Sequence, residues 1–322
     1  MTLISSCVEL CRVLSTIVES IETINGSIMF KAYARFNGIP LQVKATNNPF
    51  KTPNGRLPVL RTKHTSLDKV SEIIQYLKKT NFDSSSANNS KEYAEFIAYD
   101  TMLKDKLYPA MQFIWWLDQT NLNELVRPWY CKAVPFPLNY YYPSKFENQA
   151  KAVIETLYPT EDNMTVIENK VYSEAQKCLT SLSTRLGDSK YFLGQSHTML
   201  DAVVYSYLAP LLKTPLVNPP LQNHLKACTN LVTFVTHISQ KYFRDEYQQY
   251  EKVKSENNVK RMRKDSYTEF PNKRRDQVLA GIFAAAAMIG YALLTGKLEV
   301  PIKDNKMINQ AEEYILEDEV DE

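Results

Sequence analysis

One stretch in the second half of the chain decides the fold: YFLGQSHTMLDAVVYSYLAPLLK, residues 191–213. In it, Thr198 stands three residues before Asp201, and a long apolar run follows. This spacing is typical of a capping box, in which the two side chains satisfy backbone N–H groups at the start of a helix. The sequence therefore predicts that a helix starts at Thr198 and continues through the apolar run.

An α/β pattern lies upstream, in SIMFKAYARFNGIPLQVKATNNPFKTPNGRLPVLRT, residues 27–62. Apolar residues at helical spacing predict a short helix from Ile28 that ends near Asn37-Gly38. PLQVKAT alternates as a strand, TPNG is typical of a turn, and RLPVLRT is a second strand with Pro58 at its start. A further helix is predicted in DKVSEIIQYLKK, with Val70, Ile73, Ile74 and Leu77 facing inward.

Together the two patterns resemble glutathione transferases, which join a thioredoxin-like domain to an all-helical domain. The box resembles the one that opens the central helix of the transferase helical domain; the alternative is a local cap in an unrelated helical protein. In the thioredoxin fold the proline that opens the second recognised strand is cis, so we predict a cis Leu57–Pro58 bond. We expect a mostly α protein with a small α/β part: a thioredoxin-like domain over 27–85 and a helical domain over 86–243.

Residues 1–26 do not look like the opening strand of that fold, which leaves the first strand absent or replaced. No secretory signal is present, because Glu9, Arg12 and Glu19 interrupt any apolar core. Apolar residues instead recur at helical spacing and predict an amphipathic helix. They are Leu3, Cys7, Leu10, Leu14 and Ile17.

The resemblance also implies where glutathione would bind. Such enzymes hold its γ-glutamyl group with the residue after the cis proline and an acid-serine pair that opens the next helix, and here the positions of the pair carry Lys69 and Val70. Valine cannot donate a hydrogen bond, and lysine repels the ammonium group of glutathione. The activating residue should stand just before the first helix, where Ser27 is the local candidate, but we expect Ser27 to start the helix. We therefore predict no catalytic residue and no cofactor.

A second long apolar stretch lies near the C-terminus, in RRDQVLAGIFAAAAMIGYALLTGK, residues 274–297. The part without charge, 278–294, spans roughly 25 Å as a helix, and residues 295–296 extend it to about 28 Å. A hydrocarbon layer is ~30 Å thick, so we predict a transmembrane helix over 278–296; the alternative is a helix buried in the domain. Anchor residues are Val278, Gly281, Phe283, Met288, Tyr291 and Leu294, and flanking bases are Lys273, Arg274, Arg275 and Lys297.

Charged segments border this span. Residues 244–277 are dense in Lys, Arg, Glu, Asp and Asn and predict a solvated linker, partly helical. The alternative for its basic cluster at 260–264 is contact with anionic lipid headgroups. Residues 297–322 form an acidic tail. Because the bases before the span favour the cytosolic side, the large N-terminal part is expected to face the cytosol.

Composition excludes several classes of function. A net charge of +2 over 322 residues gives no electrostatic case for nucleic-acid binding, and 8 Gly make a phosphate cradle unexpected. The five cysteines are scattered and odd in number, which indicates reduced thiols in a cytosol-facing protein. Cys7 and Cys11 could share a helix face, but no histidine or second cysteine pair completes four ligands. We predict no metal site.

Several motifs resemble the metaxin family over roughly residues 27–296. They are FIWWLDQTNLNELVRPWYCKAVPFPLNYYYP (113–143), PFKTPNGRLPVLRT (49–62), SYLAPLLK (206–213) and AAMIGYALLTG (286–296). The late apolar stretch is similar to the anchor of the metaxin-1 and metaxin-3 type.

That resemblance implies an outer-membrane protein of mitochondria that pairs with a second metaxin. The pair would work with a β-barrel assembly subunit in the sorting and assembly machinery, which imports and inserts β-barrel proteins. The alternatives are a membrane-anchored glutathione transferase-like enzyme and an outer-membrane adaptor for mitochondrial transport.

The aromatic and proline-rich run after residue 128 fits two interpretations. Its rings could fill a helical core, or they could supply binding energy at an interface. The residues that we assign to the interface interpretation are Trp129, Tyr130, Phe136 and Tyr141.

Overall fold

The computed structural model describes residues 2–5, 21–39, 42–45, 59–62, 65–79, 90–133, 138–161, 163–265, 281–288 and 291. Contacts divide the chain into one compact unit, Met1–Asn257, and a second unit, Asn258–Glu322. The expected thioredoxin-like and helical parts both lie in the first unit.

A four-stranded sheet forms the α/β part, with the strand order β2-β1-β3-β4. The strands are β1 (Thr2–Ser5), β2 (Gln42–Ala45), β3 (Val59–Arg61) and β4 (Ser66–Leu67). β1 runs parallel to β2 and antiparallel to β3, so that Leu3 lies opposite both Val43 and Leu60. β3 and β4 are antiparallel. This is the order and direction of a thioredoxin-like sheet.

The expectation that the first strand is absent or replaced is therefore wrong. β1 occupies an inner position of the sheet and pairs on both sides. A strand of four residues is too short to show a clear alternation of apolar and polar residues. Its pairing also depends on residues about 40 and 57 positions away, which local sequence does not reveal. Leu3 belongs to this strand and not to an amphipathic helix. Residues 6–20, which carry the rest of that predicted helix, lie outside the described residues.

Helix α1 spans Ile21–Phe36 and starts earlier than the sequence suggests. Ser27 lies inside the helix and is fully buried, so the prediction that it starts the helix is wrong. The boundary expected at residue 26 also falls within α1. The C-terminal end is as predicted: Asn37 Nδ2 donates to the Tyr33 carbonyl at 2.9 Å, and Gly38 has a φ of 61°. A positive φ of this kind is the usual helix stop.

Helix α2, Val70–Lys79, lies where the sequence predicts a helix and buries Ile73 and Leu77, whereas β4 before it was not predicted. Ile74 is half-buried. The Leu57–Pro58 bond lies outside the described residues, so the cis assignment stays a prediction.

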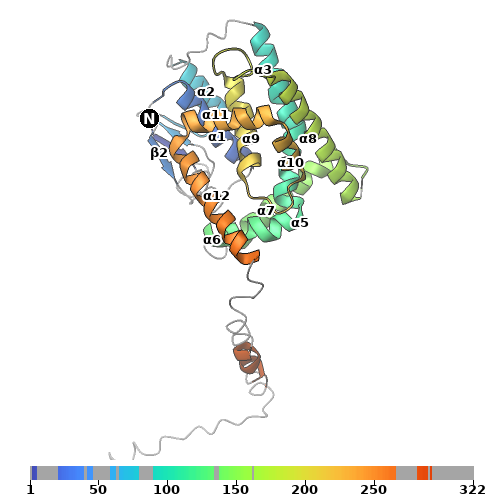
Figure 1. Ribbon diagram of the computed structural model, residues 1–322. Coiled ribbons are helices and arrows are strands. Elements are labelled where there is room, and N and C mark those ends of the chain that lie inside the picture. The colour runs from blue at the N-terminus through green and yellow to red at the C-terminus, as the bar shows by residue number, and fades with distance from the viewer. Residues whose placement is uncertain are drawn as a thin grey trace, which may run out of the picture. The chain divides into compact units, whose positions relative to one another are not determined.

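After α2 the regular elements among the described residues are helices (Figure 1). These elements, with π-helical turns marked η, are α3 (Ser90–Met102), η3 (Leu103–Leu107), α4 (Tyr108–Gln112), η4 (Phe113–Leu117), α5 (Gln119–Asn121), η5 (Leu122–Val126), α6 (Arg127–Ala133), α7 (Leu138–Leu157), α8 (Met164–Leu186), α9 (Met199–Lys213), α10 (Pro220–Ala227), α11 (Thr229–Tyr242) and α12 (Arg244–Asp265).

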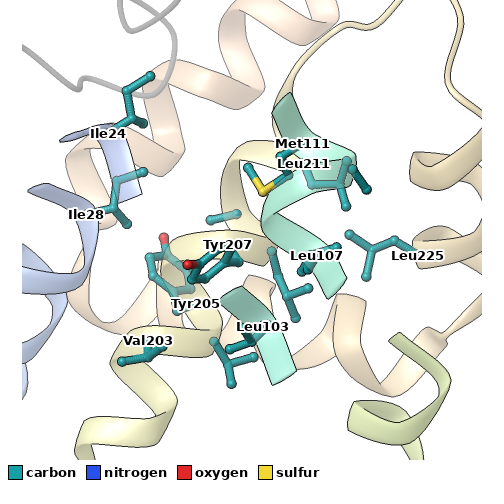
Figure 2. Packing of buried hydrophobic residues seen from close by; sticks show 14 of the residues in the cluster. Ile24, Ile28, Leu103, Leu107, Met111, Val203, Tyr205, Tyr207, Leu211 and Leu225 are labelled. Atoms are coloured by element: carbon teal, nitrogen blue, oxygen red, sulfur yellow. The ribbon is translucent and has the colours of Figure 1, made fainter. Parts of the chain in front are cut away.

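Helix α9 is the centre of the core. All of its residues except Met199 and Leu212 are buried, and it contacts α1, α3, α10 and α11. Figure 2 shows Ile24 and Ile28 of α1 on one side of Tyr205, with Leu103 and Leu107 on the other side. Helix α9 thus joins the α/β part to the helical part in one core.

The segment 244–277, predicted as a linker, begins with the regular helix α12. Residues up to Asn257 belong to the first compact unit, so a linker cannot start at 244. Local composition misled here because the contacts that hold the first turns of α12 come from α1 and α9.

In the second unit the structure describes a helix over residues 281–288. Its side chains are exposed, among them Ile282, Phe283 and Met288, and so is Tyr291. No helix within the described ranges is both long and apolar enough to cross a membrane. Within the predicted 278–296 span, residues 278–280, 289–290 and 292–296 lie outside the described residues. The same holds for the flanking bases Lys273, Arg274, Arg275 and Lys297.

Candidate functional site

The Thr198–Asp201 box is built around a fully buried carboxylate. Asp201 Oδ2 accepts from the Thr198 backbone N–H at 2.7 Å and from the Thr198 hydroxyl at 2.8 Å. Asp201 Oδ1 accepts from the Phe192 N–H at 2.9 Å. Burial raises the pKa of Asp201, and these hydrogen bonds oppose that shift. The carboxylate therefore ties the FLG segment to the start of α9, which is a structural role.

At the position that the sequence resemblance assigns to γ-glutamyl binding, the structure has an ion pair within one helix turn. Lys69 Nζ lies 3.0 Å from Glu72 Oε1, and both side chains are exposed. The pair stands directly after β4 and at the start of α2. The Val70 side chain lies outside the described set.

Ser27, the candidate activating residue, is also unsuited to that chemistry. Its hydroxyl is buried inside α1 and has no hydrogen-bond partner among the residues that the structure describes. A nucleophile or activating donor must reach the substrate and be held by a neighbouring base or donor. Ser27 meets neither condition.

For metals, the described residues contain no group of three or more His, Cys, Asp or Glu that could hold an ion. Cys7 and Cys11 lie outside those residues. Cys178 is buried, and burial raises the pKa of its thiol to about 12, so it stays protonated and unreactive.

Arg35 fastens the start of α12 to α1. Its Nη2 lies 2.5 Å from Glu246 Oε1, and its Nη1 donates to the Tyr242 carbonyl at 2.8 Å. The guanidinium also lies 4.3 Å from the Phe243 ring centroid. Burial raises the pKa of Glu246, but the hydrogen bond and charge of Arg35 outweigh it, so the pKa lies below its ordinary value.

A tyrosine and histidine cluster lies beside this contact and was not predicted from the sequence. Lys241 Nζ donates to the Tyr191 hydroxyl at 3.2 Å, and His237 Nε2 lies 3.5 Å from the same oxygen. His197 stacks on Phe36 at 4.9 Å. Burial and the nearby Lys241 lower the pKa of both histidines. Both rings pack within this cluster, His197 on Phe36 and Tyr242 and His237 on Tyr191.

The aromatic residues that were assigned to an interface differ in burial. Tyr130 is buried against Trp116, with ring centroids 5.8 Å apart, so its assignment to an interface is wrong. Trp129 is half-buried and packs on Trp115 at 6.2 Å. Tyr141 is 59% exposed. Phe136 lies outside the described residues. The core interpretation thus holds for Tyr130, and the exposed ring of Tyr141 is still available for an interface.

An open hollow of about 770 Å³ lies along the exposed face of α7. Residues that line it include Tyr140, Tyr141, Lys145, Asn148, Gln149 and Ala152. Sequence reasoning found Tyr141 but missed the polar residues. Lys145 follows Tyr141 by four residues and Asn148 follows it by seven, about one and two helical turns, and this spacing was the available signal.

Two family models match parts of this chain. Residues 27–147 match a family described as "Outer mitochondrial membrane transport complex protein". Residues 175–238 match the glutathione S-transferase C-terminal domain. Among solved structures, glutathione S-transferase III in its apo form has a TM-score of 0.46 and 15% identity, over 77% of this chain and 95% of that one. The sheet order, the capping box and the matched helical domain define a glutathione-transferase-like protein.

Sequence relatives narrow this class. Metaxin-1 of Macaca fascicularis is 36% identical over 278 residues, which cover 85% of this chain and 86% of that protein. Metaxin-3 of Danio rerio is 36% identical over 224 residues, 68% of this chain and 71% of that protein. The chain belongs to the metaxin family.

Proposed function

We propose that this chain is a non-enzymatic scaffold of the mitochondrial outer membrane. In the proposal it acts as a subunit of the sorting and assembly machinery that imports and inserts β-barrel proteins, together with a second metaxin. Membership of the metaxin family supports this role. So does the match of residues 27–147 to the family described as "Outer mitochondrial membrane transport complex protein".

One observation carries the non-enzymatic part of the proposal: the Lys69–Glu72 pair at the start of α2. A binding site for the γ-glutamyl group needs an acid to accept from its ammonium and a hydroxyl to donate to its carboxylate. Lys69 offers only donors and a positive charge, and Glu72 Oε1 already pairs with it. Together with the buried position of Ser27, this supports a chain without substrate anchoring or thiol activation.

The proposal further includes an anchor over residues 278–296, with the first unit on the cytosolic side. The support is the uncharged run 278–294 and the bases that precede it. Fixing a binding module at the membrane raises its effective concentration toward a partner in the same membrane, often to ~mM. A scaffold gains from such tethering without any chemistry of its own.

The test is affinity purification of the tagged full chain from crosslinked mitochondria, in parallel with the chain lacking residues 278–296. We expect the full chain to co-purify with a second metaxin and a β-barrel subunit, and mitochondria depleted of it to insert radiolabelled β-barrel precursors more slowly. Recovery of the full chain without either partner, with unchanged precursor insertion, contradicts the proposal.

A further inference from the structure

Two neighbouring, exposed tyrosines in the first turns of α7 line the open hollow. Tyr140 is 67% and Tyr141 is 59% exposed. Large aromatic side chains gathered at a hollow mark an interaction site more often than isolated exposed apolar residues do. Neither ring is part of the core, because the buried residues of α7 are Pro143, Phe146, Ala150 and Ile154.

Consecutive ring contacts connect Tyr141 to the core. Its centroid lies 5.5 Å from that of Tyr142, which stacks on Phe146 at 6.2 Å. Phe146 in turn lies 5.2 Å from the fully buried Trp116. A surface ring that is fixed to the core loses little conformational freedom when a partner covers it, so more of the contact energy remains as affinity.

The charge at the hollow is positive. Among the described lining residues Lys145 is the charged one, and it stands one helical turn after Tyr141. The acidic neighbour Glu147 is paired with Arg127 at 3.3 Å. An exposed ammonium next to apolar rings favours a carboxylate that lies beside an apolar group. The side-chain amides of Asn148 and Gln149 can both donate to and accept from an extended backbone.

We propose that this α7 face, formed by Tyr140, Tyr141, Lys145, Asn148 and Gln149, binds an extended segment of a partner protein in which an acidic residue adjoins apolar residues. The inference rests on the proposed scaffold function and names the surface and the chemistry of its partner. A lipid surface fits the face less well. Membrane-binding faces carry several Lys or Arg with Trp, Phe or Leu, whereas this hollow carries one lysine and two amides.

The test selects ligands from a library of random peptides displayed on phage, using the full chain in detergent micelles. The most enriched peptide is then synthesised with a fluorophore, and its affinity is measured by anisotropy. The variants are Tyr141→Ser and Lys145→Glu. Matched controls are Tyr93→Ser, an equally exposed tyrosine on α3, and Lys151→Glu, an exposed lysine of α7 outside the hollow.

We expect enriched peptides to combine acidic with apolar residues. Tyr141→Ser and Lys145→Glu should each weaken binding about tenfold, and selection on Lys145→Glu should favour basic peptides. The two controls should bind as the unaltered chain does. All four sites are exposed, so thermal unfolding should be unchanged and a loss of binding is not a loss of fold.

Three results overturn the inference: enriched peptides without acidic residues, equal weakening by Lys151→Glu, or binding in micelles that disappears in nanodiscs rich in phosphatidylserine. The last result assigns the face to lipid. A chain that co-purifies with its transport partners yet selects no such peptide overturns the α7 assignment and leaves the proposed function standing.

Discussion

Arg35 and Glu246 stand 211 positions apart in the sequence and form an ion pair 2.5 Å long. The pair joins α1 of the α/β part to the first turn of α12, the last helix of the first unit. It is half-buried, and Arg35 also contacts the Tyr242 carbonyl and the Phe243 ring. The helix that leads toward the predicted anchor is therefore fastened to the folded core at its start.

Arg35→Ala should destabilise the first unit by about 1–2 kcal/mol, because hydrogen bonds to charged groups that are partly shielded from water are stronger than neutral ones. Thermal unfolding of the full chain in micelles measures the effect. Arg127→Ala is the matched control, since Arg127 pairs with Glu147 at 3.3 Å and is more exposed. Its cost should stay within about 0–1 kcal/mol. Equal shifts for the two variants would contradict a special role for Arg35.

The same pair predicts a pH dependence. The pKa of Glu246 in the folded state lies below its ordinary value, so folding favours the ionised carboxylate. Its contribution is present above the ordinary pKa of about 4.3 and is lost as the pH falls through the lower folded-state pKa. The stability difference between the unaltered chain and Glu246→Gln should be constant near neutral pH and shrink in acid. A difference that grows in acid would reverse the assigned sign.

Asp201→Ala should destabilise the helical part by about 2–4 kcal/mol. The substitution removes an N-terminal cap and leaves the buried N–H of Phe192 without its acceptor. Asp201→Asn retains an acceptor oxygen and should cost less. Asp188→Ala, in an exposed turn, is the control for unfolding experiments. Unchanged melting of Asp201→Ala would mean that the box does not hold α9.

The aromatic run should separate into core and surface residues on mutation. Tyr130→Ala leaves a cavity beside Trp116 and should cost about 3–5 kcal/mol. Tyr141→Ala removes an exposed ring and should change stability by about 0.5 kcal/mol or less. Chemical denaturation of both variants checks this order. A larger loss for Tyr141 than for Tyr130 would place the wrong residue in the core.

Deleting residues 278–296 should release the protein from mitochondrial membranes. The uncharged run is the predicted anchor: the whole chain carries 23% charged residues, and none of them lies in 278–296. Carbonate washing followed by immunoblotting separates the two states. If the shortened chain remains in the washed membrane pellet, the anchor lies elsewhere or is incomplete.

Local signals revealed the parts of the fold that local chemistry determines. Thr198 and Asp201 act within one helical turn, and Asn37-Gly38 stops α1 through its own backbone geometry. The start of α1 was misjudged because Asn25-Gly26 looks like a break. Packing against α9 overrides that weak helix propensity.

Long-range partners explain the other errors. The strand Thr2–Ser5 is specified by pairing with β2 and β3, and α12 by contacts with Arg35. At the candidate binding surface, Tyr130 and Tyr141 have the same chemistry and lie in one aromatic run. Only the fold decides that the first faces Trp116 and the second faces solvent. Composition cannot make that distinction.

Titration calorimetry of the full chain with millimolar glutathione tests the central claim, that this transferase-like fold works as a scaffold and performs no glutathione chemistry. We predict no heat of binding, because Lys69 is paired with Glu72 where a transferase needs an acid-serine pair and Ser27 is buried within α1. Saturable heat, accompanied by conjugation of a standard electrophile above the buffer rate, would contradict the scaffold account and favour an enzyme.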